Sequence, residues 1–231
     1  MSEYKQIGRP KPLLDGLEKV TGRTRYAPDL SVPGMLHGRF VTSPHAHARI
    51  ENIDVTAALQ VPGVTAVLTA ADLPNIAPSS RNRLLLARDE VIFAGQPVAL
   101  VLAEDLGAAQ DAVDKVWIDY DILPAVITID EALADDAPLV WPAGMPGVSG
   151  DAGAHGANVG GDKRDKKPSN IAAETRFERG NLAAGFAAAD VVVERPFTTA
   201  MVHQSYLETF SMLVQPDPMG PGATVWTSTQ A

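Results

Sequence analysis

Two histidines separated by a single residue, His45 and His47, form the pattern in this sequence that most resembles a pair of metal ligands. On a β-strand this spacing would place both rings on one face, as in some metal sites. No third ligand of suitable type lies close by in the sequence, and the chain has no cysteine. We therefore expect the two histidines to shape a loop rather than to bind a metal ion.

The absence of cysteine from all 231 residues excludes several kinds of chemistry. The chain cannot form a disulfide, hold an iron–sulfur cluster through thiolates or use a thiol nucleophile. It also has no local signature of a nucleophilic serine hydrolase. Any iron–sulfur electron transfer associated with this protein is therefore expected on another polypeptide.

The sequence Gly95-Gln96-Pro97 is a candidate ligand loop, but it does not follow the pattern of a phosphate-binding loop, because no Lys-Ser/Thr pair follows it. Gly95 is expected to permit a tight turn and Pro97 to fix the entry into the next strand. We expect a structural turn here and no nucleotide site.

Apolar periodicity predicts that the surrounding sequence forms a compact α/β region that positions these residues. A continuous apolar run over 98–103 is typical of a strand buried on both faces, and Asp105 is a plausible N-cap for the helix that starts at Leu106. Asp130 is expected to cap another short helix. Further strands are predicted at 35–42, 50–55, 64–69 and 116–122.

The composition changes sharply between Trp141 and Ser169, where Gly is frequent and large apolar side chains are rare. Such a segment cannot bury enough surface to order itself, so we expect a linker or surface excursion. The predicted domains are 1–141, a linker at 142–169, and 170–231, with residues 1–34 forming an extended arm. The last part is expected to contain a helix at 182–189, strands at 188–199 and 224–228, an extended segment at 204–214 and a turn at 216–222.

The formal net charge of −9 and the pI near 5.0 argue against nucleic acid or an anionic membrane as the main partner. No apolar run approaches the length of a transmembrane helix, so direct membrane insertion is not expected. The first residues lack the pattern of a secretory signal. The expected location is cytoplasmic, with export as the passenger of a partner left open.

Four sequence blocks occur in an order that resembles one enzyme family: SPHAHARI, PGVTAVLTAADLP, GQPVA and WIDYDILPA. They resemble the N-terminal hammerhead domain of the large subunit of xanthine dehydrogenase/aldehyde oxidase-type enzymes. The later stretch from NIAAETRFERG to VWTSTQA resembles the start of the molybdopterin-binding domain that follows in those subunits. The resemblance implies an α/β (α+β) fold, with a hammerhead domain followed by an incomplete molybdopterin-binding domain.

The resemblance also implies candidate site residues. Gln230, in the sequence TSTQ, matches a glutamine that hydrogen-bonds to an oxygen ligand of molybdenum, although it could simply be a polar residue at a strand end. Glu208, in HQSYLET, could orient a group beside the cofactor, and a structural role is the alternative. His203 and Gln204 lie near a possible substrate funnel, but a simple hydrogen-bonded role is expected for the histidine.

The resemblance implies that the complete enzyme oxidises aldehydes or N-heterocycles with oxygen derived from water. A molybdenum–pterin cofactor would perform the chemistry, and electrons would leave through 2Fe-2S clusters, usually towards FAD. The implied partners are a chain with the rest of the molybdopterin-binding subunit, iron–sulfur subunits, and FAD or cytochrome subunits. The family's later cofactor loops and its glutamate base do not occur in these residues, so we expect the chain not to be catalytic alone.

A different class of function stays open at this point. The chain could be a non-catalytic scaffold or interaction subunit of a multi-subunit oxidoreductase, which holds neighbours without touching a cofactor. Gln230 separates the two interpretations, because only the enzyme-subunit interpretation requires it beside molybdenum.

Overall fold

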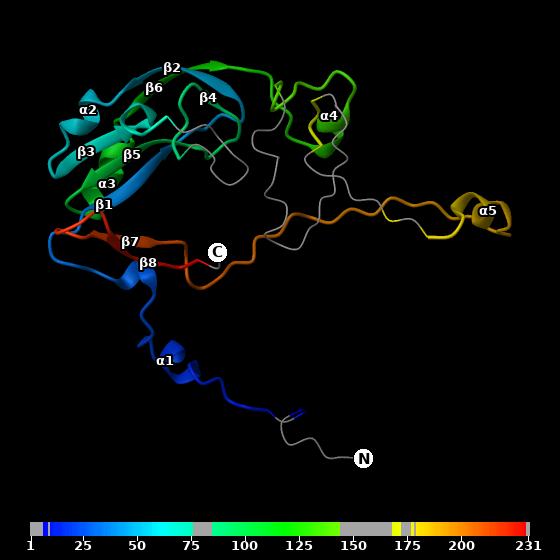
Figure 1. Cartoon of the computed structure of the whole chain (residues 1–231), viewed down its shortest axis with the longest axis horizontal. Coiled ribbons are helices and arrows are strands. Elements are labelled where there is room, and N and C mark those ends of the chain that lie inside the picture. The colour runs from blue at the N-terminus through cyan, green and yellow to red at the C-terminus, as the bar shows by residue number, and fades with distance from the viewer. Residues whose placement is uncertain are drawn as a thin grey trace. The chain divides into compact units, whose positions relative to one another are not determined.

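The computed structural model describes residues 7–8, 10–75, 85–143, 168–171, 177 and 179–229. The chain divides into two compact units: a central unit of residues 34–190, and a terminal unit in which residues 1–33 join residues 191–231. Figure 1 follows the chain through both. The domain boundaries expected from composition stay a prediction, and most of the expected linker at 142–169 lies outside the described residues.

The first sheet of the central unit is built around strand β5 (Pro97–Ala103), which pairs antiparallel with β1 (His37–Thr42) on one side and β3 (Val64–Thr69) on the other. Val98, Ala99, Val101 and Ala103 of β5 have no exposed surface. This confirms the strand buried on both faces that the continuous apolar run predicts.

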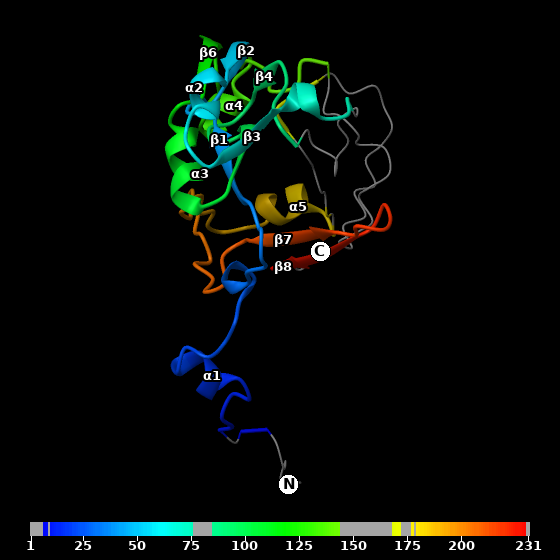
Figure 2. The same ribbon diagram turned by 90° about the vertical axis from the view of Figure 1, so that its left-hand side faces the viewer.

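Helix α3 (Leu106–Val113) covers this sheet and packs against β1 and β5 (Figure 2). Its buried face consists of Ala108, Ala109 and Ala112, whose small side chains allow the helix to lie close to the strands. The short helix α2 (Thr56–Leu59) packs beside it and contributes the fully buried Ala58. As expected, Asp105 caps α3: its Oδ1 accepts from the backbone N–H of Ala108 at 2.9 Å.

A second antiparallel sheet has the order β4-β2-β6 and contains β4 (Glu90–Val91), β2 (Ala48–Asp54) and β6 (Trp117–Ile122). Strands β5 and β6 precede and follow helix α3 in the sequence but belong to different sheets. The two strands that the helix connects are therefore not paired with each other. The two sheets share apolar contacts, because Val98 of β5 is buried with Ala48 and Val91, and Ile118 of β6 packs against both clusters.

Three short elements complete the described part of the central unit. Helix α4 (Ile129–Leu133) is capped by Thr128, which forms a reciprocal capping box with Glu131, so the expectation that Asp130 caps this helix is wrong. Thr128 comes before Ile129, where a cap must stand, whereas Asp130 already lies inside the first turn. Helix α5 (Leu182–Ala187) is capped by Asn181. A 3-10 turn, η2 (Ala70–Asp72), follows β3.

The terminal unit is built from the two ends of the described chain. It contains helix α1 (Gly16–Val20), the 3-10 turn η1 (Ala27–Asp29) and the hairpin of β7 (Met212–Pro216) and β8 (Ala223–Thr227). Strand β7 contacts η1. The hairpin confirms the predicted turn at 216–222, where the N–H of Asp217 donates to the carbonyl of Gly222 at 2.8 Å.

Two expectations for this part are wrong. The arm at 1–34 is not wholly extended, because it contains α1 and η1. The β-branched run within 188–199 forms no strand: Val191, Val192 and Val193 are 78%, 56% and 74% exposed and pair with no described strand. A run of β-branched residues favours extended backbone, but a strand needs a hydrogen-bonded neighbour, which sequence propensity does not supply.

The cap of α3 gives a direct test of this fold. We expect Asp105→Ala to lower the free energy of unfolding by about 1 kcal/mol, because the free N–H of Ala108 loses its acceptor. Urea unfolding followed by circular dichroism measures the change. Asp111→Ala, at an exposed position on the same helix, is the matched control and should change stability by less than about 0.5 kcal/mol. Equal losses in the two variants would contradict a specific role for the cap.

Candidate functional site

Glu208 lies in the segment between residue 203 and β7 and is half-buried. Its Oε1 accepts a hydrogen bond from the backbone N–H of Ala27, the first residue of η1, at 3.2 Å. The contact joins residues that are 181 positions apart in the sequence. The one described partner of this carboxylate is therefore the backbone of the N-terminal arm, which favours the structural role that the sequence left open.

Ser228 fastens the end of β8 to the same segment. Its Oγ accepts from the N–H of Ser211 at 3.1 Å and donates to the carbonyl of Thr209 at 3.0 Å. The sequence gives only a weak signal for Ser228, which stands between two threonines, because its role depends on contact with Ser211, 17 residues away. Gln230 lies outside the described residues.

The segment 203–206 contains the remaining candidates of this region. The N–H of Ser205 donates to Nδ1 of His203 at 3.1 Å, and the His203 ring lies 5.2 Å from that of Tyr206. Ser205 has a φ of 52°, a left-handed backbone conformation that is uncommon for a residue other than glycine. His203 and Gln204 are both exposed. The contact of Nδ1 agrees with the expectation of a simple hydrogen-bonded histidine.

His45 and His47 do not lie on a strand, as a shared-face metal pair would require, but in the bend between β1 and β2. The His45 ring packs edge-on against Tyr120 with 5.0 Å between ring centroids. His47 contacts two acceptors, with Nδ1 2.5 Å from the carbonyl oxygen of Pro124 and Nε2 2.5 Å from Oε1 of Glu90. Both nitrogens can donate only when the ring is protonated.

The environment of His47 favours that protonated form. Burial by itself would lower the pKa of His47, but the Pro124 carbonyl and the Glu90 carboxylate accept from the ring and together raise the pKa above its ordinary value of 6.5. The side chain of His47 is 18% exposed, and that of Glu90 is 46% exposed. Because Glu90 lies 43 residues further along the chain, local sequence offered no sign of this pair.

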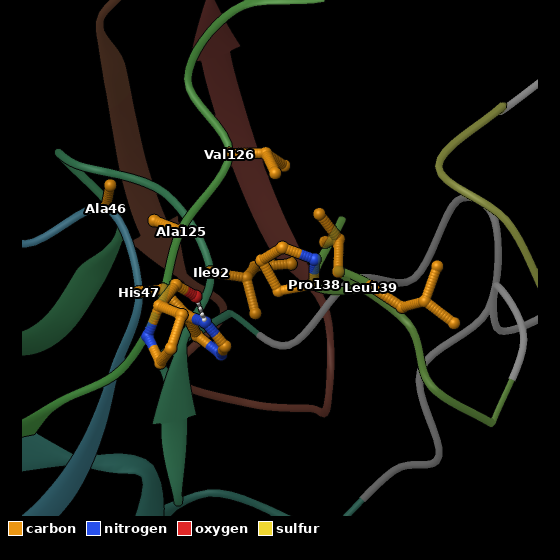
Figure 3. Close-up of a pocket in the computed structure, with 9 residues that line it drawn as sticks. Ala46, His47, Ile92, Ala125, Val126, Pro138 and Leu139 are labelled. Carbon is orange, nitrogen blue, oxygen red and sulfur yellow. Dashed lines mark hydrogen bonds between the residues drawn. The ribbon is translucent and has the colours of Figure 1, made fainter. Parts of the chain in front are cut away.

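A shallow hollow lies beside His47 (Figure 3). Its lining is mostly apolar and includes Ile92, Val126, Pro138 and Leu139. Because both ring nitrogens of His47 are already engaged, the hollow offers no free charged group for recognition of a polar ligand.

The Gly95-Gln96-Pro97 sequence is a structural turn, as expected. Gly95 has a φ of 89°, where only glycine is unstrained, and its N–H donates to the carbonyl of Ser43 at 2.7 Å. The Gln96 side chain accepts from the N–H of Ile92 at 2.8 Å. The Gly95 contact holds the turn against the 43–47 bend, and the Gln96 contact closes the turn on itself.

A pterin cofactor requires a concave surface with several converging polar groups. In the described part of the terminal unit, the side chains of β8 are exposed and the Ser228 hydroxyl already has two partners. Among the described residues no group of three His, Cys, Asp or Glu could hold a metal ion.

Comparison with known proteins assigns both parts of the chain. A family model described as "Aldehyde oxidase and xanthine dehydrogenase, a/b hammerhead domain" matches residues 21–124, and one described as "Molybdopterin cofactor-binding domain" matches residues 163–231. The chain belongs to the aldehyde oxidase and xanthine dehydrogenase family. The resemblance drawn from the sequence blocks and the fold class that it implies are confirmed.

Individual members of the family match almost all of this chain. The carbon monoxide dehydrogenase large chain of Afipia carboxidovorans is 36% identical over 97% of this chain and 27% of its own length. A probable hypoxanthine oxidase of Escherichia coli K12 is 31% identical over 97% of this chain and 25% of its own length. The chain thus spans about a quarter of the length of these curated relatives.

Solved structures of the family share the fold. A crystal structure of Cu,Mo-CO dehydrogenase in its carbon monoxide reduced state superposes with a TM-score of 0.75 and 34% identity, over 97% of this chain and 28% of that chain. Quinoline 2-oxidoreductase from Pseudomonas putida 86 gives a TM-score of 0.74 and 30% identity, over 99% of this chain and 27% of that chain.

None of the helices in the described ranges is long and apolar enough to cross a membrane.

The His47 contacts predict a pH-dependent contribution to stability. Because the pKa of His47 is raised in the folded state, its contribution is complete below the unfolded pKa near 6.5 and is lost as the pH rises through the folded pKa. We expect the difference in unfolding free energy between the wild type and His47→Gln to be largest below about pH 6.5 and to shrink as the pH rises above that value. Urea titrations below and above this pH measure it.

The Glu90→Gln variant separates the two acceptors in the same titrations. It should weaken this pH dependence without abolishing it, because the Pro124 carbonyl remains in place. A difference between the wild type and His47→Gln that stays constant or grows with pH would show that His47 is not held as the cation.

Proposed function

We propose that residues 1–231 are part of the large subunit of a molybdenum hydroxylase that oxidises aldehydes or N-heterocycles with oxygen derived from water. The observation that carries the proposal is the order of two matches in one chain: a hammerhead domain at 21–124, followed by a molybdopterin cofactor-binding domain at 163–231. Relatives that match 97% of this chain include a carbon monoxide dehydrogenase large chain and a nicotine 6-hydroxylase large subunit.

The two parts of the chain have different roles in this proposal. Residues 1–141 supply the hammerhead, and residues 170–231 supply one wall of the cofactor domain, with Gln230 directed to an oxygen ligand of molybdenum. The rest of the site comes from the three quarters of the relatives' length that these residues do not cover, on the same chain or on another. Residues 1–231 expressed alone are then expected to bind no molybdenum cofactor.

The molybdenum–pterin cofactor, when bound, supplies the oxidising centre and accepts two electrons from the substrate. We propose that 2Fe-2S clusters on a partner carry these electrons to FAD or a cytochrome subunit. The absence of cysteine from these residues supports a separate location for the clusters. This chain's own contribution is to position groups and exclude water around the cofactor.

A non-catalytic scaffold is the second candidate, and one observation favours it: the side chains of β8, which leads into the TSTQ motif, are exposed, and the Ser228 hydroxyl already has two backbone partners. The two candidates differ in metal content. The deciding experiment purifies the native assembly that contains this chain, then measures its mass, its molybdenum and iron content, and its oxidation of aldehydes and N-heterocycles. Stoichiometric molybdenum with turnover supports the hydroxylase, whereas an assembly without molybdenum in every preparation supports the scaffold.

Gln230 provides the sharpest mutational test of the hydroxylase. In the active assembly, we expect Gln230→Ala to lower turnover by about 10–100-fold with molybdenum content nearly unchanged, because a hydrogen bond to a metal ligand tunes the metal without anchoring the pterin. Gln215→Ala, at an exposed glutamine on β7, is the matched control and should retain wild-type turnover. Unchanged turnover in Gln230→Ala would make Gln230 structural, and loss of molybdenum would make it an anchor.

A further inference from the structure

In the terminal unit, the N-terminal arm and the end of β8 both form hydrogen bonds with residues 208–211. From the N-terminal arm, the N–H of Ala27 donates to Glu208. From the end of β8, the Ser228 hydroxyl contacts the backbone of both Thr209 and Ser211. The backbone adds one more link, because the N–H of Ser228 donates to the carbonyl of Ser211 at 3.3 Å. We call residues 208–211, with Ala27 and Ser228, the junction.

Hydrogen bonds within the N-terminal arm close the turn η1. The Asp29 carboxylate accepts from the N–H of Tyr26 at 2.9 Å, and the Arg25 guanidinium donates to the Asp29 carbonyl at 3.0 Å. The N–H of Asp29 donates to the carbonyl of Tyr26 at 2.9 Å. These bonds stabilise η1 locally, and the N–H of Ala27 is left for an acceptor from outside the turn. Glu208 is that acceptor.

Polar contacts matter more at the junction than they would in a large core. Among the described residues of the terminal unit none belongs to the buried hydrophobic core, and Met212, Val214 and Val225 on the hairpin are 63%, 48% and 48% exposed. With little apolar burial to hold the arm, a part-buried hydrogen bond to a charged acceptor makes a large share of the local stability.

We infer that Glu208 is a positioning residue: it fastens the arm to the segment that leads into β7, and so helps to fix the hairpin whose second strand runs into the TSTQ motif. In this role Glu208 acts as a hydrogen-bond acceptor, and its negative charge does not touch the cofactor. The effect on turnover rests on the proposed function, whereas the effect on the arm does not.

Three variants separate the acceptor from the charge. Glu208→Gln keeps an acceptor oxygen in the same place but removes the charge, and Glu208→Ala removes both. Glu194→Gln, at an exposed glutamate of the same unit, is the control for a general change of surface charge. Each variant is produced in the native assembly. Amide hydrogen exchange is measured by mass spectrometry for peptides that cover 24–30 and 208–214, with kcat and KM measured alongside.

We expect Glu208→Ala to speed exchange at the Ala27 amide by about tenfold, the size expected for loss of a hydrogen bond to a charged group at a part-buried site. Turnover should fall in the same variant. Glu208→Gln should restore most of the protection and most of kcat, and Glu194→Gln should match the wild type in both measurements. Rescue by the uncharged amide is the result that a contact of the charge with the cofactor would not give.

Two results would overturn the inference. One is unchanged exchange at 24–30 in Glu208→Ala. The other is a Glu208→Gln variant with wild-type exchange but with the turnover loss of Glu208→Ala, since that would assign the charge of Glu208 to the cofactor site. An assembly whose wild type has no molybdenum-dependent turnover would instead remove the proposed function, and the exchange measurements would still decide the role of Glu208.

Discussion

Strand β5 is the constraint on which the central unit depends. It has a hydrogen-bonded neighbour on each edge and buried side chains on each face, and its residues contribute to all three apolar clusters of the unit. A strand in this position tolerates no polar side chain facing inward, because a buried polar group without a partner costs roughly 1–3 kcal/mol. The alanines of α3 follow from the same constraint, since larger side chains would push the helix away from β1 and β5.

The bend at 43–47 is held to the strands of the central unit by hydrogen bonds, and these position the His47 side chain. Backbone hydrogen bonds tie Ser43 to Gly95 and Gln96, and the N–H of Leu123 donates to the carbonyl of His47 at 3.0 Å. The imidazole then joins β4 to the segment after β6 through its two nitrogens. His47, one of the two histidines that most resemble metal ligands in the sequence, therefore joins structural elements.

The terminal unit is held together in a different way. Its described elements come from both ends of the sequence and meet through backbone and side-chain hydrogen bonds, with many apolar side chains left exposed. Exposed apolar surface of this kind is typical of a surface that packs against further protein. In the proposed enzyme, that further protein is the rest of the cofactor domain.

The sequence by itself determined the family, the α/β character, most strands of the central unit and the cap of α3, because each depends on short-range patterns: four ordered blocks, period-two alternation, a continuous apolar run, and an aspartate before a helix. Only the tertiary structure decided which strands pair, that 191–193 pair with none of the described strands, and that His47 meets Glu90 and Glu208 meets Ala27. Those contacts join residues 43 and 181 positions apart. Local propensity is the same whether or not a distant partner arrives, so only the folded chain shows where such hydrogen bonds form.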